Sequence, residues 1–90
     1  MKIKKGFVLR QVCGQHIIVA EGLESLNFGK MLALNETGAW LWKEAEKMGD
    51  FTVDSLAARL CDEYDVEADE ARNDVAEFTS QWKEVSVVDD

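Results

Sequence analysis

The hydrophobic pattern of this chain changes its period at Asn35, and that change limits the folds open to it. Before Asn35, the segments Phe7–Val12 and Gln15–Ala20 are rich in β-branched and apolar residues, which is typical of strands. The two residues between them include a glycine, which permits the tight turn of a β-hairpin. Glu21–Gly29 contains several turn-forming residues and predicts a loop, after which Lys30–Leu34 predicts a third short strand.

From Glu36 onwards the apolar residues recur with helical spacing. The first predicted helix runs from Glu36 to a stop at Gly49, and Thr52 is a suitable N-cap for the second. The third helix follows Val66, is expected to be the longest, and ends near Ser86. Its apolar residues step by three and four positions along one face: Ala68, Ala71, Val75, Phe78, Trp82 and Val85.

Three short antiparallel strands followed by three helices predict an α+β fold in a single domain over residues 1–90. The last two helices would form a helix-turn-helix, with the strands as a wing at the amino end. Val87 and Val88 are expected to form a brief extended tail, and Asp89 and Asp90 are expected to fray. No apolar run approaches the roughly 20 residues that cross a bilayer, so we expect no membrane contact and a cytoplasmic location.

Charge is distributed unevenly along the chain. Residues 1–35 carry five basic and two acidic groups, whereas residues 36–90 carry five basic and sixteen acidic groups. In a DNA-binding helix-turn-helix the last helix lies between phosphates, which Lys and Arg must face. Between Glu67 and Val85 this helix has six acidic and two basic residues. A nucleic-acid partner is therefore not expected.

Candidate catalytic and metal-binding residues are few. Cys13 and Cys61 lie far apart in the sequence, and His16 is the only histidine. A zinc site needs several such ligands, and a nucleophile needs an adjacent base, so neither chemistry is expected. The sequence predicts a protein that is not an enzyme and that uses no metal or cofactor.

The segment Leu34–Trp42 reads Leu-Asn-Glu-Thr-Gly-Ala-Trp-Leu-Trp. It resembles the Leu-Asn-x-Thr-Gly-x-x-(Ile/Leu)-Trp signature of PqqD-like proteins, where the third strand enters the first helix. Further similarities to that family occur along the chain, in Gly6–Arg10, Phe51–Val53, Leu56–Ala57, Glu63–Val66, Asp74–Val75 and Phe78. One departure is Trp82–Ser86, where such proteins commonly close the third helix with a glycine followed by Leu or Ile.

The signature residues also have structural roles that do not depend on the resemblance. Asn35 can bond backbone groups at the corner between strand and helix, and Thr37 can bond the first helical turn. Gly38 permits close packing of the backbone, and Trp40 and Trp42 bring a large apolar area to a small core.

The resemblance to PqqD-like proteins implies a peptide recognition element. Such proteins bind the leader of a ribosomally made precursor peptide, which adds as a strand beside the third strand in a groove bounded by the third helix. The partner is a separate modifying enzyme, often a radical SAM protein, in the biosynthesis of PQQ or another peptide-derived product. This mode of binding is β-augmentation, and it requires a free edge strand.

The expected peptide-binding residues lie on these two elements. On the strand they are Lys30, Met31, Leu32, Ala33 and Leu34. On the helix they are Val75 and the Arg72 flank, a stripe of four residues that is not acidic: Arg72, Ala76, Thr79 and Lys83. The alternative for Arg72 and Lys83 is ordinary surface charge paired with Glu neighbours, which would contribute little. The other flank of the helix, here called the Asp74 flank, is assigned to solvent and consists of Asp74, Glu77, Gln81 and Glu84.

Two further questions stay open from the sequence. A winged scaffold can also serve a transcriptional regulator, or a structural subunit that acts through protein contacts. In addition, neighbouring residues of an antiparallel strand direct their backbone groups to opposite sides, so Leu32 and Ala33 must differ. The sequence does not indicate which of the two faces outward.

Overall fold

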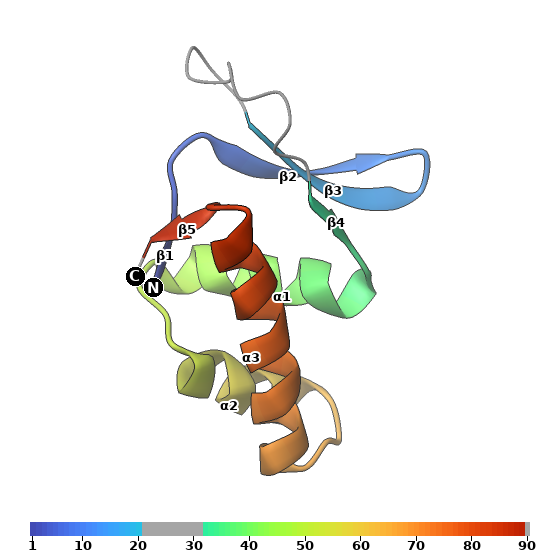
Figure 1. Cartoon of the computed structure of the whole chain (residues 1–90). Coiled ribbons are helices and arrows are strands. Elements are labelled where there is room, and N and C mark those ends of the chain that lie inside the picture. Colours follow the sequence, from blue (N-terminus) through green and yellow to red (C-terminus); the bar gives the residue numbers. More distant parts are fainter. Residues whose placement is uncertain (21–31, 90) are drawn as a thin grey trace.

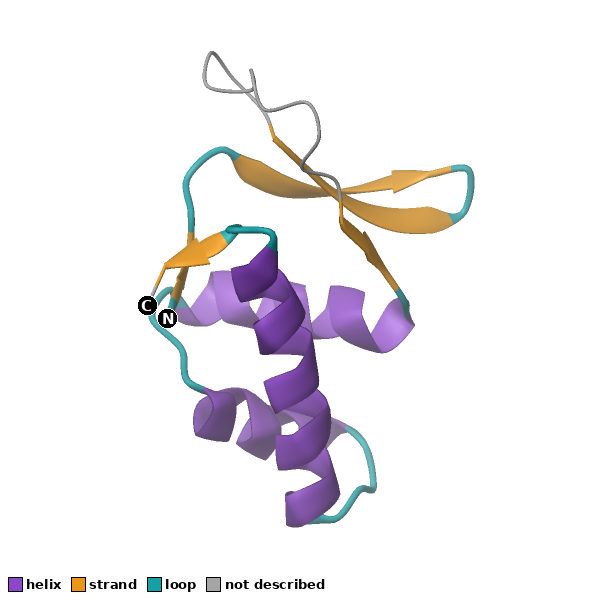
Figure 2. Ribbon diagram, viewed as in Figure 1, coloured by secondary structure: helices purple, strands orange, loops and turns teal. Residues whose placement is uncertain are grey.

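The strands precede the helices in the chain, and the α+β fold with three helices after the amino-terminal strands is confirmed. The computed structural model describes residues 1–20 and 32–89. Its elements, in chain order, are β1 (Lys2–Ile3), β2 (Phe7–Val12), β3 (Gln15–Ala20), β4 (Leu32–Leu34), α1 (Glu36–Met48), α2 (Val53–Glu63), α3 (Ala68–Glu84) and β5 (Val88–Asp89). The helices lie on one side of the sheet formed by β2, β3 and β4 (Figure 2).

That sheet is antiparallel, with the strand order β2-β3-β4. Cys13 and Gly14 connect β2 to β3 with φ angles of 52° and 78°. Two consecutive positive φ angles are the mark of a type I′ turn, whose twist matches that of a hairpin. The predicted hairpin is confirmed. β4 pairs with β3 on the side away from β2 and leads into α1 (Figure 1).

The helix boundaries follow local capping chemistry. At the start of α1, the Asn35 side chain accepts a hydrogen bond of 2.8 Å from the backbone N–H of Gly38, and Gly49 ends the helix with a φ of 76°. Thr52 and Ser55 form a capping box at the start of α2, each side chain bonding the other residue's backbone N–H. These ends agree with the prediction because caps depend on residues only a few positions apart.

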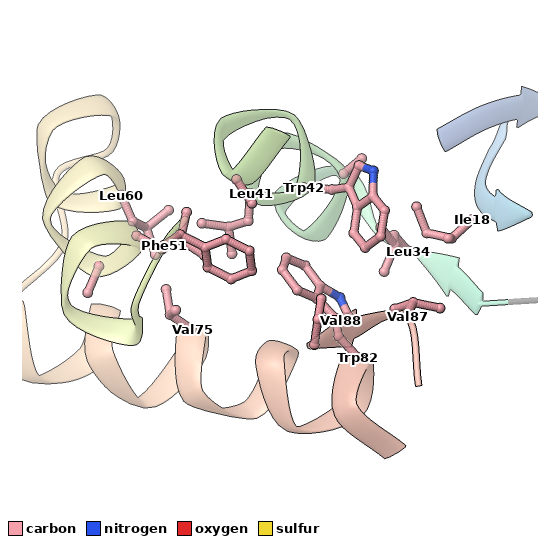
Figure 3. Close-up of a cluster of buried hydrophobic side chains, with 14 of the residues drawn as sticks. Ile18, Leu34, Leu41, Trp42, Phe51, Leu60, Val75, Trp82, Val87 and Val88 are labelled. Atoms are coloured by element: carbon pink, nitrogen blue, oxygen red, sulfur yellow. The ribbon is translucent and has the colours of Figure 1, made fainter. Parts of the chain in front are cut away.

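The core lies where α1, α2, α3 and the sheet meet (Figure 3). The rings of Trp42 and Trp82 contact edge to face with centroids 5.2 Å apart, and Phe51 lies 6.1 Å from Trp82 in the same manner. Ile18 and Leu34 close the core from the sheet. Such aromatic pairs stabilise by about 0.5–1.5 kcal/mol beyond their buried area.

Two details differ from the sequence prediction or lie beyond it. The described part of the third strand begins at Leu32, so Lys30, Met31 and the predicted loop Glu21–Gly29 lie outside the described residues. Asp89 was expected to fray, but it belongs to β5, which pairs with β1 in a second, two-stranded sheet. This pairing is possible because Val87 and Val88, just before Asp89, are buried in the core and fix the end of the chain.

The buried stripe of α3 also differs from the predicted one. Ala71, Val75 and Trp82 are buried as expected, whereas Ala68 is exposed and Phe78 is only half-buried. Thr79 is buried in their place, and its hydroxyl donates to the backbone carbonyl of Ala76 at 3.1 Å. Spacing alone does not fix the rotation of a helix about its axis, and here packing against both α1 and α2 turns Thr79 inward.

Candidate functional site

The outer edge of β4 is a free strand edge. The sheet order places β4 last, and within residues 1–20 and 32–89 no strand pairs with its outer side. A free edge offers backbone N–H and C=O groups to another extended chain. The edge therefore meets the main requirement of strand addition.

The pairing register shows which backbone groups of β4 face outward. A type I′ turn over Val12–Gln15 directs the backbone groups of Gln15 toward β2, so those of the next residue, His16, are directed toward β4. His16 is opposite Leu34, and Ile18 is opposite Leu32, so both leucines direct their groups inward to β3. The N–H and C=O of Ala33 consequently point to the free edge.

A hollow adjoins this edge where β4 enters α1. We call it the corner hollow. It has a volume of about 340 Å³ and is lined by Asn35, Thr37, Asp74, Glu77, Phe78 and Gln81. The first two residues come from the corner between β4 and α1, and the other four come from α3. The hollow thus lies between the end of the edge strand and α3.

Close packing of α1 and α3 shapes the corner hollow. A Cβ atom on Gly38 would lie 2.9 Å from Cε1 of Phe78, which is too close for a stable contact. Any side chain at position 38 would therefore displace the Phe78 ring. The glycine of the Leu34–Trp42 segment keeps this ring, half-buried, in the wall of the hollow.

The electrostatic character of the corner hollow is negative. Asp74 and Glu77 line it, and within residues 1–20 and 32–89 no lysine or arginine does. Among the described residues neither carboxylate has an ion-pair partner, whereas Glu44, Asp50, Asp54 and Asp89 are paired elsewhere. The hollow therefore favours a positively charged group.

A second hollow lies at the other end of the same corner and is called the hairpin hollow. It is lined by Gln11, Gly14, Gln15, His16, Ala33, Leu34, Asn35 and Glu36, with a volume of about 540 Å³. Asn35 belongs to both hollows, so they meet where β4 ends. Together the two hollows extend from the last residues of β4, through Asn35, to α3.

The predicted site residues do not all lie together. Leu32, Ala33 and Leu34 form β4 as predicted. Val75 and Thr79 are buried in the core, at 0% and 3% exposure.

The remaining residues of the Arg72 flank are exposed on α3. Arg72 Nε lies 3.0 Å from a carboxylate oxygen of Asp54. Arg72 therefore forms a surface ion pair, as in the alternative, but its partner is an aspartate of α2 and not a Glu neighbour. The Arg72 flank is thus not the side of α3 that lines the corner hollow. Peptide contact by Ala76 and Lys83 stays a prediction.

The helix residues that line the corner hollow are not among the expected peptide-binding residues. Helical spacing places Asp74, Glu77 and Gln81 on the solvent flank and Phe78 in the core stripe. Phe78 approaches Gly38 so closely that position 38 has no room for a Cβ atom, and sequence spacing alone does not reveal this contact. The available signal was the glycine of the Leu34–Trp42 segment, which indicates close approach of another element.

Both cysteines of the chain are free thiols. Cys13 is exposed at the hairpin turn and Cys61 is half-buried in α2. No group of three or more His, Cys, Asp or Glu residues in the described ranges is placed to hold a metal ion. In the same ranges no helix has both the length and the apolar character of a membrane span.

Two solved structures are similar to this chain over most of its length. One is TbiB1 in complex with the TbiA(beta) leader peptide, with 18% identity, a TM-score of 0.74 and coverage of 97% of this chain and 93% of that chain. The other is lasso peptide synthetase B1 complexed with the leader peptide, with 20% identity, a TM-score of 0.69 and coverage of 92% and 89%. At these identities the likeness establishes a common fold.

Comparison with curated protein sequences gives no match. Residues 15–88 match the family described as coenzyme PQQ synthesis protein D (PqqD). This segment includes β3, β4, all three helices and the Leu34–Trp42 signature. The chain therefore belongs to the PqqD family.

Proposed function

We propose that this chain is a non-catalytic module that captures the leader of a ribosomally made precursor peptide and presents it to a separate modifying enzyme. The observation that carries the proposal is the free edge of β4, with Ala33 directed outward at the hairpin hollow and with the corner hollow at the end of the strand. Membership of the PqqD family and the two similar structures with bound leader peptides support it. A radical SAM protein is the class of enzyme proposed as the partner.

Strand addition explains how a small domain can bind a peptide without a deep pocket. Backbone hydrogen bonds to the edge strand provide affinity, and side-chain pockets provide selectivity. Ala33 would exchange hydrogen bonds with the leader, while Phe78 and Gln81 would contact its side chains in the corner hollow. Lys30 and Met31 precede β4 and remain proposed contacts on the strand side.

A backbone amide titration tests this function. The isotope-labelled protein is titrated with a synthetic leader peptide. Its sequence is taken from a short reading frame that lies beside the gene for this protein and beside a gene for a peptide-modifying enzyme. Saturable shifts are expected at Leu32–Leu34, at Asn35 and Thr37, and around Phe78 and Gln81. The amides of Ala76 and Lys83 report on the Arg72 flank in the same spectra. Shifts confined to surfaces away from β4 would contradict the proposal.

A further inference from the structure

We infer that the peptide bound at β4 carries a lysine or arginine whose side chain occupies the corner hollow. The inference rests on the proposed function, because it assumes that the peptide adds to β4. It specifies the chemistry that the site selects: a basic side chain directed toward α3, between Asn35 and Thr37 on one side and Asp74 and Glu77 on the other.

The corner hollow carries two acidic side chains from α3. Asp74 and Glu77 lie three positions apart on α3, so they are neighbours on one helix face. They have no cationic partner among the described residues, and each described residue that lines the hollow is acidic or uncharged. A peptide cation would give both carboxylates a counter-charge, whereas a peptide carboxylate at the same place would be repelled.

The shape and apolar wall of the hollow also suit a long basic side chain. Phe78 contributes an apolar, half-buried ring next to the two carboxylates. Lysine and arginine bury their aliphatic stems on apolar surface while keeping the charged group near water. A volume of about 340 Å³ accommodates one such side chain with several waters, since a water occupies about 30 Å³ in the liquid.

The hydrogen-bonding groups at the corner add selectivity for a donor. Asn35 Oδ1 already accepts from Gly38, but an amide oxygen has a second lone pair. Thr37 and Gln81 offer further acceptor oxygens around the hollow. Lysine and arginine side chains are pure donors, so they suit a hollow lined by two carboxylates and several residues with neutral acceptor oxygens.

The test uses a phage-displayed library of random linear peptides, selected on the parent protein. Selected peptides are first measured against Ala33→Pro, to establish that they bind at β4. Their affinities are then measured for the double variant Asp74→Asn, Glu77→Gln. The matched control is Asp62→Asn, Glu63→Gln at the end of α2, which makes the same change in net charge away from the hollow.

The peptides of interest are those that bind the Ala33→Pro variant more weakly than the parent. In these peptides we expect a lysine or arginine at a constant position. Neutralising Asp74 and Glu77 should weaken these peptides roughly fivefold to tenfold, as expected for two partly exposed ion pairs. Replacing the peptide's basic residue by glutamine should cost a similar factor on the parent and almost nothing on the Asp74→Asn, Glu77→Gln variant. The Asp62→Asn, Glu63→Gln control should bind like the parent.

Two other results would overturn the inference, and they differ from each other. Peptides that depend on β4 but show no basic preference, or that weaken equally with the control variant, would refute the basic side chain and leave strand addition intact. Selected peptides that bind Ala33→Pro as tightly as the parent would refute strand addition at β4 itself, and the inference with it.

Discussion

Ala33 and Leu32 are neighbours in β4 whose backbone groups point in opposite directions. Proline removes the N–H donor and is tolerated in a sheet only where that group faces outward. Ala33→Pro should therefore fold like the parent and bind a confirmed leader at least roughly fivefold more weakly, since one hydrogen bond contributes about 1 kcal/mol. Leu32→Pro should be poorly folded by circular dichroism. Two folded variants with parental affinity would show that the peptide pairs elsewhere.

Gly38 is the other position where a single atom has a large effect. An added Cβ would lie 2.9 Å from Cε1 of Phe78, whose half-buried ring can move, and 3.3 Å from Oδ1 of Asn35. Against this crowding, alanine favours a helix over glycine by up to about 1 kcal/mol. Gly38→Ala should therefore leave the melting temperature nearly unchanged but push the ring into the corner hollow. Peptide affinity should fall, and Gly38→Ala combined with Phe78→Leu should recover part of it. Unchanged affinity in Gly38→Ala would show that Phe78 does not shape the binding site.

At the scale of elements, α3 is held by one buried aromatic cluster. Trp82 is fully buried against Trp42 and Phe51, so Trp82→Ala should cost about 3–5 kcal/mol in the free energy of unfolding. Phe78→Ala should cost clearly less, because Phe78 is only half-buried. Chemical denaturation of both variants measures the difference. Equal costs would mean that the rotation of α3 described above is wrong.

The contact between α1 and α2 includes a buried carboxylate. Glu44 accepts hydrogen bonds from Lys47 Nζ at 3.1 Å and from Arg59 Nη1 at 2.9 Å. The hydrogen bond from Lys47, supported by Arg59 and opposed by burial, lowers the pKa of Glu44 below its ordinary value of 4.5. Because the pKa of Glu44 is lower in the folded protein than in the unfolded chain, its ionised carboxylate stabilises the fold. This stabilisation is complete at pH values above the pKa of the unfolded chain, and it is lost as the pH falls through the pKa of the folded protein.

Stability attributable to Glu44 should therefore be constant above about pH 5 and decline below pH 4.5. Glu44→Gln should be less stable than the parent at neutral pH, and the difference should shrink as the solution is acidified below that value. Denaturant titrations of both proteins across this range provide the measurement. A gap that is independent of pH would indicate that Glu44 acts through packing alone.

At the scale of the whole molecule, the helix-turn-helix outline and the charge point to different partners. α3 would be the helix that enters the major groove, yet its charge is strongly negative. Fluorescence anisotropy with a mixed-sequence DNA duplex should show no binding at physiological salt. Weak binding at low salt should disappear when Lys2, Lys4 and Lys5 are replaced by glutamine. Tight, sequence-selective binding would favour a transcriptional regulator over the peptide-binding function.

Local chemistry made much of this fold predictable. The caps at Asn35 and Thr52, the stop at Gly49 and the hairpin all depend on residues within a few positions of one another. The spacing of apolar residues changes at Asn35, and this pattern is also local, so it separated the strands from the helices. The sequence by itself therefore determined the order of the hairpin, the third strand and the three helices, and with it the fold class, while its Leu34–Trp42 signature indicated the family. The strand β1 was not predicted.

Only the tertiary structure decided which surfaces meet at the site. Helical spacing defines the stripes on α3, but packing against α1 and α2 sets its rotation, which brings the Asp74 flank rather than the Arg72 flank to the corner hollow. The outward direction of Ala33 depends on how β4 registers with β3, and the pairing of β1 with β5 joins opposite ends of the described chain. These features arise from contacts between distant residues, so no local pattern in the sequence contains them.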